Sequence, residues 1–282
     1  MKASRFLGNK TFAVTDLPTP HAGPGELVLR NQVCGVCGTD VHIYHGEPGS
    51  ADVNPPVVLG HEYSGEVVEV GKGVTGFAVG DHVTVDPNIY CGHCAYCQNG
   101  KKQLCPSMEA IGVTRDGGFA QYSRIPASQA FKLEPTVPWE AAAMAEPLAC
   151  CLHGIDLAGI QVGDKVCVVG GGANVVIECV GNVPAVKSAF QFAGKGATVL
   201  LFSVPKVDAT FDLPLFDVYK KELTIKGSFV NPDTHARAVA LINSGKVDFG
   251  PIITHRFTLD QLPEAIAMQM SDASIKVVVE AQ

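Results

Sequence analysis

The chain lacks the features of a membrane protein and of a nucleic-acid-binding protein. None of its apolar runs approaches the roughly 20 residues that a membrane-spanning helix needs. Its 21 Lys and Arg residues are outnumbered by 28 Asp and Glu residues, which gives a formal net charge of -7, and they form no basic cluster. Because recognition of nucleic acid requires concentrated positive charge, we expect no nucleic-acid partner and no membrane association.

The N-terminus also lacks the apolar segment of a secretory signal, because residues 1–6 read Met-Lys-Ala-Ser-Arg-Phe. The chain nevertheless contains ten cysteines. In a reducing compartment, cysteines bind metal more often than they form disulfides. We therefore expect a cytoplasmic protein with metal-binding cysteines. Its 282 residues, 46% of them hydrophobic, suit two domains of ordinary size.

Four of the cysteines share one short stretch with the spacing C-x2-C-x2-C-x7-C. They are Cys91, Cys94, Cys97 and Cys105. Four thiolates on one loop form a closed tetrahedral site, which is the structural kind of zinc site. The alternative is a disulfide cluster, which a reducing compartment disfavours. The spacing therefore predicts a structural zinc ion.

A second group of potential ligands lies within residues 33–62. Cys37, His61 and Glu62 supply a thiolate, an imidazole and a carboxylate, all of which are good zinc ligands. His61 and Glu62 are consecutive, so they can point the same way only at a bend, which Gly60 permits. The alternative is a buried cysteine and a hydrogen-bonded histidine in an ordinary β domain.

Hydrophobic patterns place regular elements along the whole chain, and the first 135 residues are rich in strands. Strands are predicted over residues 26–30, 66–70, 80–85, 197–202, 223–226 and 275–279. Helices are predicted over 139–145 and 148–157, with a break at Glu146-Pro147, and from the cap residue Asn182 to Gly194. Another helix is predicted to begin at Asn231-Pro232, and Asp260 is predicted to cap the last one.

The two ligand groups, in this order, resemble the zinc-containing medium-chain dehydrogenases. The resemblance covers nearly the whole chain and is carried by specific motifs, which are Gly60-His61-Glu62, Gly80–Val83, the Cys91–Cys105 lobe, Gly117–Tyr122 and Glu146-Pro147-Leu148. Glu146–Leu148, with Cys37–His42, looks most like the polyol (sorbitol-type) branch, and threonine dehydrogenases share much of it.

The resemblance implies an α/β protein built from two domains. It predicts a β-rich GroES-like catalytic domain over residues 1–152 and a truncated Rossmann domain, a doubly wound parallel sheet, over residues 153–230. Residues 231–282 are predicted to return to the catalytic domain. Relatives of this kind are commonly dimers or tetramers, so we expect a homo-oligomer.

The resemblance also implies a reaction, in which hydride passes from an alcohol or polyol CH–OH group to NAD or NADP. Two zinc ions are expected per chain. Cys37 and His61 would hold the catalytic one with Glu62 or Glu146, and these two glutamates can exchange between binding the metal and lying behind it. Thr39 could relay the proton, and Asp40 could orient His61. Tyr44 and Phe119 match positions that line the substrate pocket, although both could simply pack in the core.

The expected dinucleotide loop is incomplete. An apolar run over residues 164–169 leads into Gly170, Gly171 and Gly172, as a first Rossmann strand leads into its phosphate loop. The G-x-G-x-x-G pattern then fails, because position 175 is Val, and no acidic residue follows on a second strand. The cofactor-binding residues implied by the resemblance are Gly170, Gly171, Gly172, Gly181, Ser203 and Ser228.

The chain runs at once into residues 174–181, which match the fourth strand of the cofactor domain. By the size of βαβ units, roughly 60 or more residues are missing between these runs. Parallel neighbours need a crossover of about a dozen residues or more, so we expect the two runs to form a hairpin, or one to leave the sheet, unless a real segment is omitted. An engineered deletion is our preferred interpretation. The alternative functions are a zinc-loaded scaffold without dehydrogenase activity and a non-enzymatic binding protein.

Overall fold

The computed structural model describes residues 1–49, 51–161, 163–167 and 172–282. The chain divides into two compact units, which are described separately. The first comprises Met1–Ala149 and Pro232–Gln282, and the second comprises Cys150–Asn231. Within the described residues, no helix combines the length and apolarity needed to cross a membrane.

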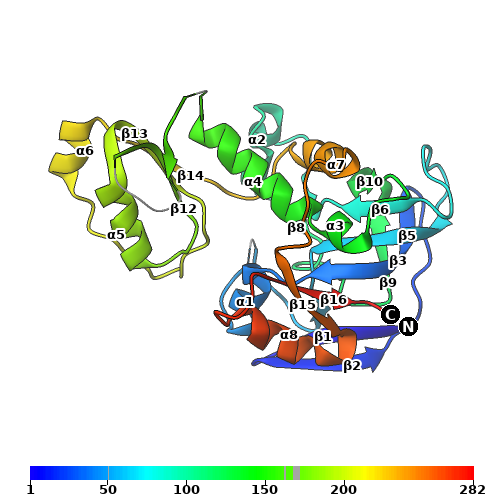
Figure 1. Ribbon diagram of the computed structural model, residues 1–282. Helices are drawn as coiled ribbons and strands as arrows, with labels where there is room; N and C mark the ends of the chain where they lie inside the picture. The colour runs from blue at the N-terminus through cyan, green and yellow to red at the C-terminus, as the bar shows by residue number, and fades with distance from the viewer. Residues whose placement is uncertain (50, 162, 168–171) are drawn as a thin grey trace. The chain divides into compact units, whose positions relative to one another are not determined.

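The first unit is built on three sheets (Figure 1). The largest has the strand order β10(Ala130–Lys132), β6(His82–Val85), β5(Glu62–Val70), β3(Glu26–Gly35), β16(Lys276–Glu280) and β15(Ile253–Thr258), and β9(Tyr122–Pro126) also pairs with β3. The smaller sheets are β2(Thr11–Asp16), β1(Lys2–Gly8) and β4(Val57–Val58), and β7(Asn88–Ile89) with β8(Glu109–Ala110). The β-rich catalytic domain implied by the resemblance is confirmed.

Short helices complete this unit. They are α1(Gly38–Tyr44), α2(Ala95–Gln98), α3(Trp139–Ala143), α7(His235–Asn243) and α8(Leu262–Gln269), with three 3-10 turns, η1(Lys102–Leu104), η2(Ala127–Gln129) and η3(Leu259–Gln261). The cap predicted at Asp260 is wrong. Asp260 lies inside η3, and Gln261 is the N-cap of α8, which begins at Leu262.

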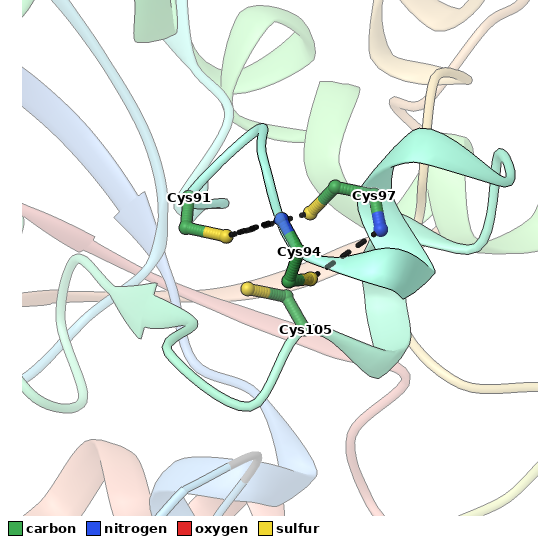
Figure 2. A group of neighbouring side chains, drawn as sticks. All are labelled: Cys91, Cys94, Cys97 and Cys105. Carbon is green, nitrogen blue, oxygen red and sulfur yellow. Dashed lines mark hydrogen bonds between the residues drawn. The ribbon is translucent and has the colours of Figure 1, made fainter.

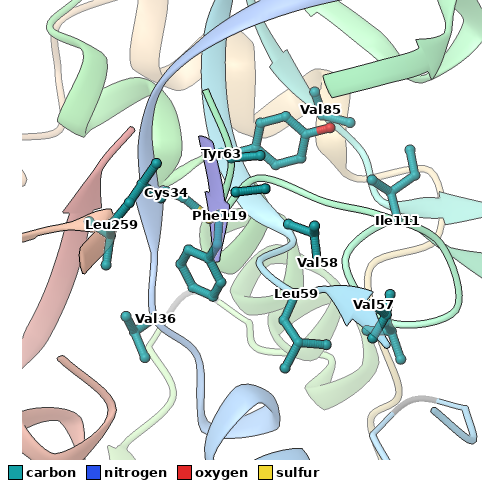
Figure 3. Packing of buried hydrophobic residues seen from close by; sticks show 14 of the residues in the cluster. Cys34, Val36, Val57, Val58, Leu59, Tyr63, Val85, Ile111, Phe119 and Leu259 are labelled. Carbon is teal, nitrogen blue, oxygen red and sulfur yellow. The ribbon is translucent and has the colours of Figure 1, made fainter. Parts of the chain in front are cut away.

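The strands of the large sheet separate two cores by simple alternation. The neighbours Val277 and Val278 on β16 belong to different clusters, because successive side chains of a strand point to opposite faces. The larger cluster contains the fully buried Tyr63, Ile111 and Phe119 (Figure 3). The smaller cluster lies on the other face of the sheet, against α3 and α7. Both faces of the strands that carry the candidate ligands are therefore covered.

The second unit is a parallel α/β layer. Its sheet has the order β11(Val166–Cys167), β12(Ala173–Glu178), β13(Ala193–Leu201) and β14(Thr224–Gly227), and every pair is parallel. The helices are α5(Val183–Phe192), α6(Leu215–Lys221) and the part of α4(Ala145–Ala158) from residue 150 on. Val175 and Val176 pack into separate clusters, so both faces of the sheet are buried. The Rossmann-type layer is thus confirmed.

The structure overturns one prediction about this layer. β11 and β12 are parallel neighbours, with Val166 opposite Val175 and Cys167 opposite Val176. The crossover rule applies to connections that run back along a whole strand. Here Cys167 lies opposite Val176, which is three residue rises, about 10 Å, beyond Ala173. Six residue steps can span about 20 Å, which exceeds this distance. Residues 168–171 themselves lie outside the described residues.

A second correction concerns the helical break before the second unit. The break lies at Met144, between α3 and α4, and not at Glu146-Pro147. Pro147 stands in the first turn of α4, where proline is tolerated because its missing N–H has no helical partner to lose. Glu146 is therefore a first-turn helical residue of α4.

Candidate active site and metal centres

The structure brings the four cysteines of the loop together (Figure 2). Their sulfur atoms all lie within 4.8 Å of one another, and Cys91 Sγ is 3.9 Å from Cys97 Sγ. Sulfurs arranged tetrahedrally at about 2.3 Å from zinc would be about 3.8 Å apart. All ten cysteines, which lie among the described residues, are free thiols. The arrangement therefore fits a structural zinc ion.

Backbone N–H groups support the thiolate form of this loop. Cys94 N donates to Cys91 Sγ at 3.3 Å, and Cys97 N donates to Cys94 Sγ at 3.4 Å. Donation from His93 and Cys94 lowers the pKa of Cys91 to about 6, whereas burial raises the pKa of Cys97 to about 12. Because thiolates are the metal-binding form, N–H donation at Cys91 favours ligation.

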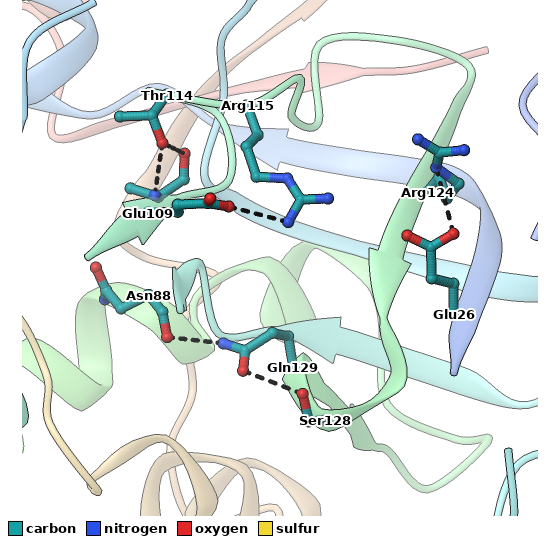
Figure 4. A network of polar contacts seen from close by, with 9 residues as sticks. Glu26, Asn88, Glu109, Thr114, Arg115, Arg124, Ser128 and Gln129 are labelled. Atoms are coloured by element: carbon teal, nitrogen blue, oxygen red, sulfur yellow. Dashed lines mark hydrogen bonds and ion pairs between the residues drawn. The ribbon is translucent and has the colours of Figure 1, made fainter. Parts of the chain in front are cut away.

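The base of the loop is fixed by polar contacts (Figure 4). Gln129 Nε2 donates to the carbonyl oxygens of Asp86 and Asn88, each at 2.8 Å, just before the loop begins. Just after it ends, Arg115 pairs with Glu109 at 3.1 Å. These contacts hold β7 and β8, the strands that flank the four cysteines.

The second group of ligands is assembled by strand pairing. β3 and β5 are antiparallel neighbours with Gly35 opposite Glu62, so the chain leaving β3 carries Cys37 beside the start of β5. Ligand atoms of Cys37, His61 and Glu62 lie within 4.8 Å of one another. Gly60 makes the bend before His61 with a φ of 91°. A Cβ there would also lie 2.7 Å from Cys34 Sγ, so only glycine fits.

Asp40 faces this group from the first turn of α1. It is fully buried, and its Oδ2 accepts a hydrogen bond from Cys37 N at 2.9 Å. Its Oδ1 lies 3.8 Å from His61 Nδ1. One carboxylate therefore touches the backbone of the candidate thiol ligand and faces the ring of the candidate imidazole ligand. Thr39 precedes it, partly buried in the same turn.

Negative charge converges on His61. Burial alone would lower the pKa of the imidazole, but the charges of Asp40, Cys37 and Glu146 raise it well above its ordinary value. Glu146 is 6% exposed and lies outside the group whose ligand atoms are within 4.8 Å. A buried cluster of anions with a histidine suits a divalent cation, and the donor set of sulfur, nitrogen and oxygen suits zinc.

Sequence reasoning missed one residue here. Lys276, the first residue of β16, donates from Nζ to Glu62 Oε2. The side chains are 13% and 2% exposed, so the ion pair is nearly buried. The sequence does show a single lysine near the start of the apolar run 275–279. No pattern in the sequence indicates that this lysine pairs with Glu62.

The two residues matched to a substrate pocket have different surroundings. Phe119 is 0% exposed and packs in the larger core, against the bend at Gly60. Its burial favours the alternative of plain packing. Tyr44 ends α1, is partly buried and stacks on Phe12 with ring centroids 6.0 Å apart. The substrate role of both residues stays a prediction.

Among the residues matched to cofactor binding, Gly170 and Gly171 lie outside the described residues. Gly172 has a φ of 74° and donates its N–H to Phe192 O at 2.8 Å. Ser228 N donates to Leu201 O at 3.0 Å, which continues the β13–β14 pairing. Gly181 and Ser203 share one partner, Glu178.

Glu178 was also missed. It is 4% exposed at the end of β12, where its Oε1 accepts from Val180 N at 2.7 Å and from Gly181 N at 2.8 Å. Ser203 Oγ donates to its other oxygen. The carboxylate thus joins the segments that follow β12 and β13.

The described residues fit a dinucleotide only in part. A pyrophosphate is normally bound at the N-terminus of the helix that follows the first strand. Within the described residues of the second unit, the element after β11 is β12, and no helix lies between them. The turns after β12, β13 and β14 are present, whereas the helix and acidic strand of a complete first βαβ unit are not among the described elements.

Comparison with known proteins agrees with this geometry. Residues 23–135 match the family model described as Alcohol dehydrogenase GroES-like domain, and residues 161–244 match the one described as Zinc-binding dehydrogenase. The chain is 32% identical to an L-threonine 3-dehydrogenase of Serratia proteamaculans over 341 positions, which cover 99% of each chain. It is also 32% identical to a sorbitol dehydrogenase of Halalkalibacterium halodurans over 337 positions, with 96% of each covered.

The first alignment also shows how many positions this chain lacks. The chain has 282 residues, 59 fewer than the 341 aligned positions, so at least 59 positions have no residue here. The number is close to the roughly 60 residues expected to be missing, and their place after Gly172 stays a prediction.

Solved structures carry the same fold. A zinc-binding dehydrogenase of Sinorhizobium meliloti bound to NADP superposes with a TM-score of 0.93 at 34% identity, covering 99% of this chain and 98% of that one. The 2R,3R-butanediol dehydrogenase of Bacillus subtilis superposes with a TM-score of 0.90, covering 100% and 99%. At 24% identity, the second likeness concerns the fold alone.

Proposed function

The chain belongs to the zinc-dependent medium-chain alcohol and polyol dehydrogenases, and from this premise we propose which residues carry its chemistry. The family reaction transfers hydride between an alcohol CH–OH group and NAD(P). We assign the catalytic zinc to Cys37 and His61 with Glu62 or Glu146, and the structural zinc to the four-cysteine loop. The observation that carries the assignment is the convergence of Cys37, His61 and Glu62 within 4.8 Å.

Zinc at this site would act as a Lewis acid that makes a nearby hydroxyl a stronger acid. The residues of the chain supply orientation and a route for the proton. Asp40 fixes the backbone of Cys37 and faces His61, so it keeps both ligands in place. We assign to Thr39, which lies two residues after Cys37, the task of accepting the hydroxyl proton and passing it on.

The substrate class is a polyol or secondary alcohol. Sorbitol dehydrogenase and threonine 3-dehydrogenase are equally similar to the chain, each at 32% identity. The sorbitol-type motif Glu146-Pro147-Leu148 favours a polyol. Tyr44 is proposed to line the pocket. The hydride acceptor is proposed to be NAD or NADP, because the NADP-bound Sinorhizobium meliloti protein is 34% identical.

A second candidate function rests on the absence, among the described residues, of a helix between β11 and β12. A zinc-loaded scaffold without dehydrogenase activity would follow if the missing positions are those that bind the adenosine half of the cofactor. The proposal further includes a cytoplasmic location, because thiolate zinc sites require reduced cysteines, and a homo-oligomer of two or four copies.

The test joins metal analysis to an activity panel. We expect two zinc ions per chain, and NAD(P)-dependent oxidation of sorbitol, 2,3-butanediol or threonine at high cofactor concentration. Cys37→Ser should lose one zinc ion and the activity while the four-cysteine loop stays loaded, because the two sites share no ligand. Cys151→Ser, at an exposed cysteine, is the matched control and should keep both ions. Loss of both ions in Cys37→Ser would contradict the two-site assignment.

A further inference from the structure

A lysine lies inside the candidate active site, where the proposed reaction has not used it. The ammonium of Lys276 donates to Glu62 Oε2, and the two side chains are 13% and 2% exposed. Pairing of β16 with β3, with Val279 opposite Cys34 and Val278 opposite Gly35, carries the lysine there from a point 214 residues along the chain.

The fold makes room for this pair at Gly35. A Cβ on Gly35 would lie 2.2 Å from Glu62 Oε2 and 3.0 Å from Lys276 Cε. The first approach is closer than real Cβ atoms come, and the second is tight, so the carboxylate and the end of the lysine occupy the space that this glycine leaves. The glycine on β3 thus gives room to an ion pair between β5 and β16.

The charges around Glu62 give it two competing partners. Its ligand oxygen lies within 4.8 Å of the ligand atoms of Cys37 and His61, and one of its oxygens accepts from Lys276. The anionic groups that act on Lys276 are Glu62, Cys37 and Glu146. A buried carboxylate must be neutralised, and here either the ammonium or a metal ion can do so.

We propose that Lys276 is a positioning residue that holds Glu62 by its carboxylate and so keeps it an exchangeable ligand of the active-site metal. With the lysine present, Glu62 can leave the metal without becoming an unpaired buried charge, and a coordination position opens to the alcohol. Without it, the metal is the remaining cation near Glu62, so the carboxylate stays bound and closes that position. The inference rests on the proposed metal site but not on the cofactor.

The test replaces the ammonium and reads the metal directly. In this experiment the full chain is loaded with Co²⁺ at the proposed catalytic site. The visible absorption of the bound Co²⁺ reports its coordination number and geometry. In Lys276→Met we expect the spectrum of a closed four-ligand site, no spectral response to added alcohol, and chelator extraction slowed about 10-fold to 100-fold, the range by which partners of metal ligands alter affinity. Lys276→Arg keeps the charge and should behave like the unmodified chain.

A double variant separates positioning from a merely structural role. Glu62→Gln with Lys276→Met removes both members of the pair, and a neutral amide neither needs the ammonium nor binds the metal strongly. We expect this variant to recover the spectral response to alcohol. Loading of the four-cysteine loop in every variant shows that the catalytic unit has folded.

The proposal is overturned if Lys276→Met keeps the spectrum and alcohol response of the unmodified chain, or if it releases the ion faster. It is also overturned if the double variant behaves like Lys276→Met. None of these readouts requires turnover, so an absence of dehydrogenase activity would count against the proposed function without deciding the role of Lys276.

Discussion

At the residue scale, the charged and polar groups that matter most are buried and each has a definable partner. Glu62 pairs with Lys276, Asp40 supports Cys37, and Glu178 joins two turns. His235 differs, because both of its ring nitrogens lack a hydrogen-bond partner among the described residues. It is 1% exposed, with its ring 4.8 Å from that of Phe131. Burial lowers its pKa to about 3.

The buried His235 predicts a pH-dependent stability. In the unfolded chain a histidine binds a proton near pH 6.5, so between about pH 3 and 6.5 the unfolded state holds more protons. The free energy of unfolding therefore falls as pH drops through this window, by about 2 kcal/mol at about pH 5. His235→Phe should remove this contribution in urea unfolding at pH 7 and pH 5.

The control for this prediction is His21→Phe, because the side chain of His21 is 87% exposed and solvated in both states. It should leave the pH dependence unchanged. If the His235→Phe variant and the unmodified chain lose the same free energy of unfolding on acidification, the prediction is wrong. His235 would then contribute nothing to the pH dependence of stability.

At the scale of elements, strand ends decide where the functional groups lie. β3 delivers Cys37, β5 begins with Glu62 and β16 begins with Lys276. In the second unit, the end of β12 is tied to the segment after β13 by Glu178. Gly181, with a φ of 83°, would place a Cβ 2.8 Å from Val204 O, so the two segments are also closely packed.

This arrangement predicts that Glu178 stabilises the cofactor-side turns. Glu178→Ala leaves two backbone N–H groups and the Ser203 hydroxyl without their acceptor, at a cost of about 1–3 kcal/mol for each group that stays buried. Hydrogen–deuterium exchange should then accelerate at the amides of residues 180 and 181, whereas the amide of Ser203, which donates to the backbone carbonyl of residue 178, keeps its acceptor. Glu178→Gln, which keeps one accepting oxygen, is the matched control and should be milder. If the amides exchange at equal rates in the Glu178→Ala and Glu178→Gln variants, the accepting oxygen of residue 178 does not stabilise these turns.

At the scale of the whole molecule, the described residues form a β-rich unit, which contains both candidate metal groups, and a shortened Rossmann-type unit. This chain lacks at least 59 positions of the alignment with the threonine dehydrogenase. Within the described residues, β11 is followed by β12 and not by a helix.

The shortened unit predicts weak cofactor binding. Among the described residues, no helix follows the first strand to bind the pyrophosphate, and no acidic second strand is present to bind the ribose. We therefore expect the binding free energy to fall by several kcal/mol, which lowers the affinity by orders of magnitude. Calorimetric titration with NADH should show weak binding, and sorbitol oxidation should be slow, while metal analysis still finds two zinc ions.

The control restores the missing segment from the Sinorhizobium meliloti relative between Gly172 and Ala173. This chimera should regain tight binding. Micromolar affinity and ordinary turnover in the unaltered chain would contradict the prediction.

The sequence by itself determined the family, the β-rich and Rossmann-type layers, and the groups from which the ligands come. It did so because these signals are local: four cysteines fit within residues 91–105, and a glycine bend places His61 next to Glu62. Asn182 was likewise identified as a helix cap, and its Oδ1 accepts from Ala185 N at 2.8 Å. A motif whose residues lie close together in the sequence can be recognised without knowing which distant residues it contacts.

Only the tertiary structure decided which distant groups meet. The register of β16 on β3 brings Lys276 to Glu62, and no local pattern encodes the register between strands so far apart. The parallel pairing of β11 with β12 contradicted the expected hairpin, because the register places Cys167 only three residues beyond Ala173, a distance that a short connection can span. Phe119 was placed in the core by the closeness of Gly60, which is a property of packing. The local sequence thus supplies the candidate ligands, and long-range strand pairing determines which residues surround them.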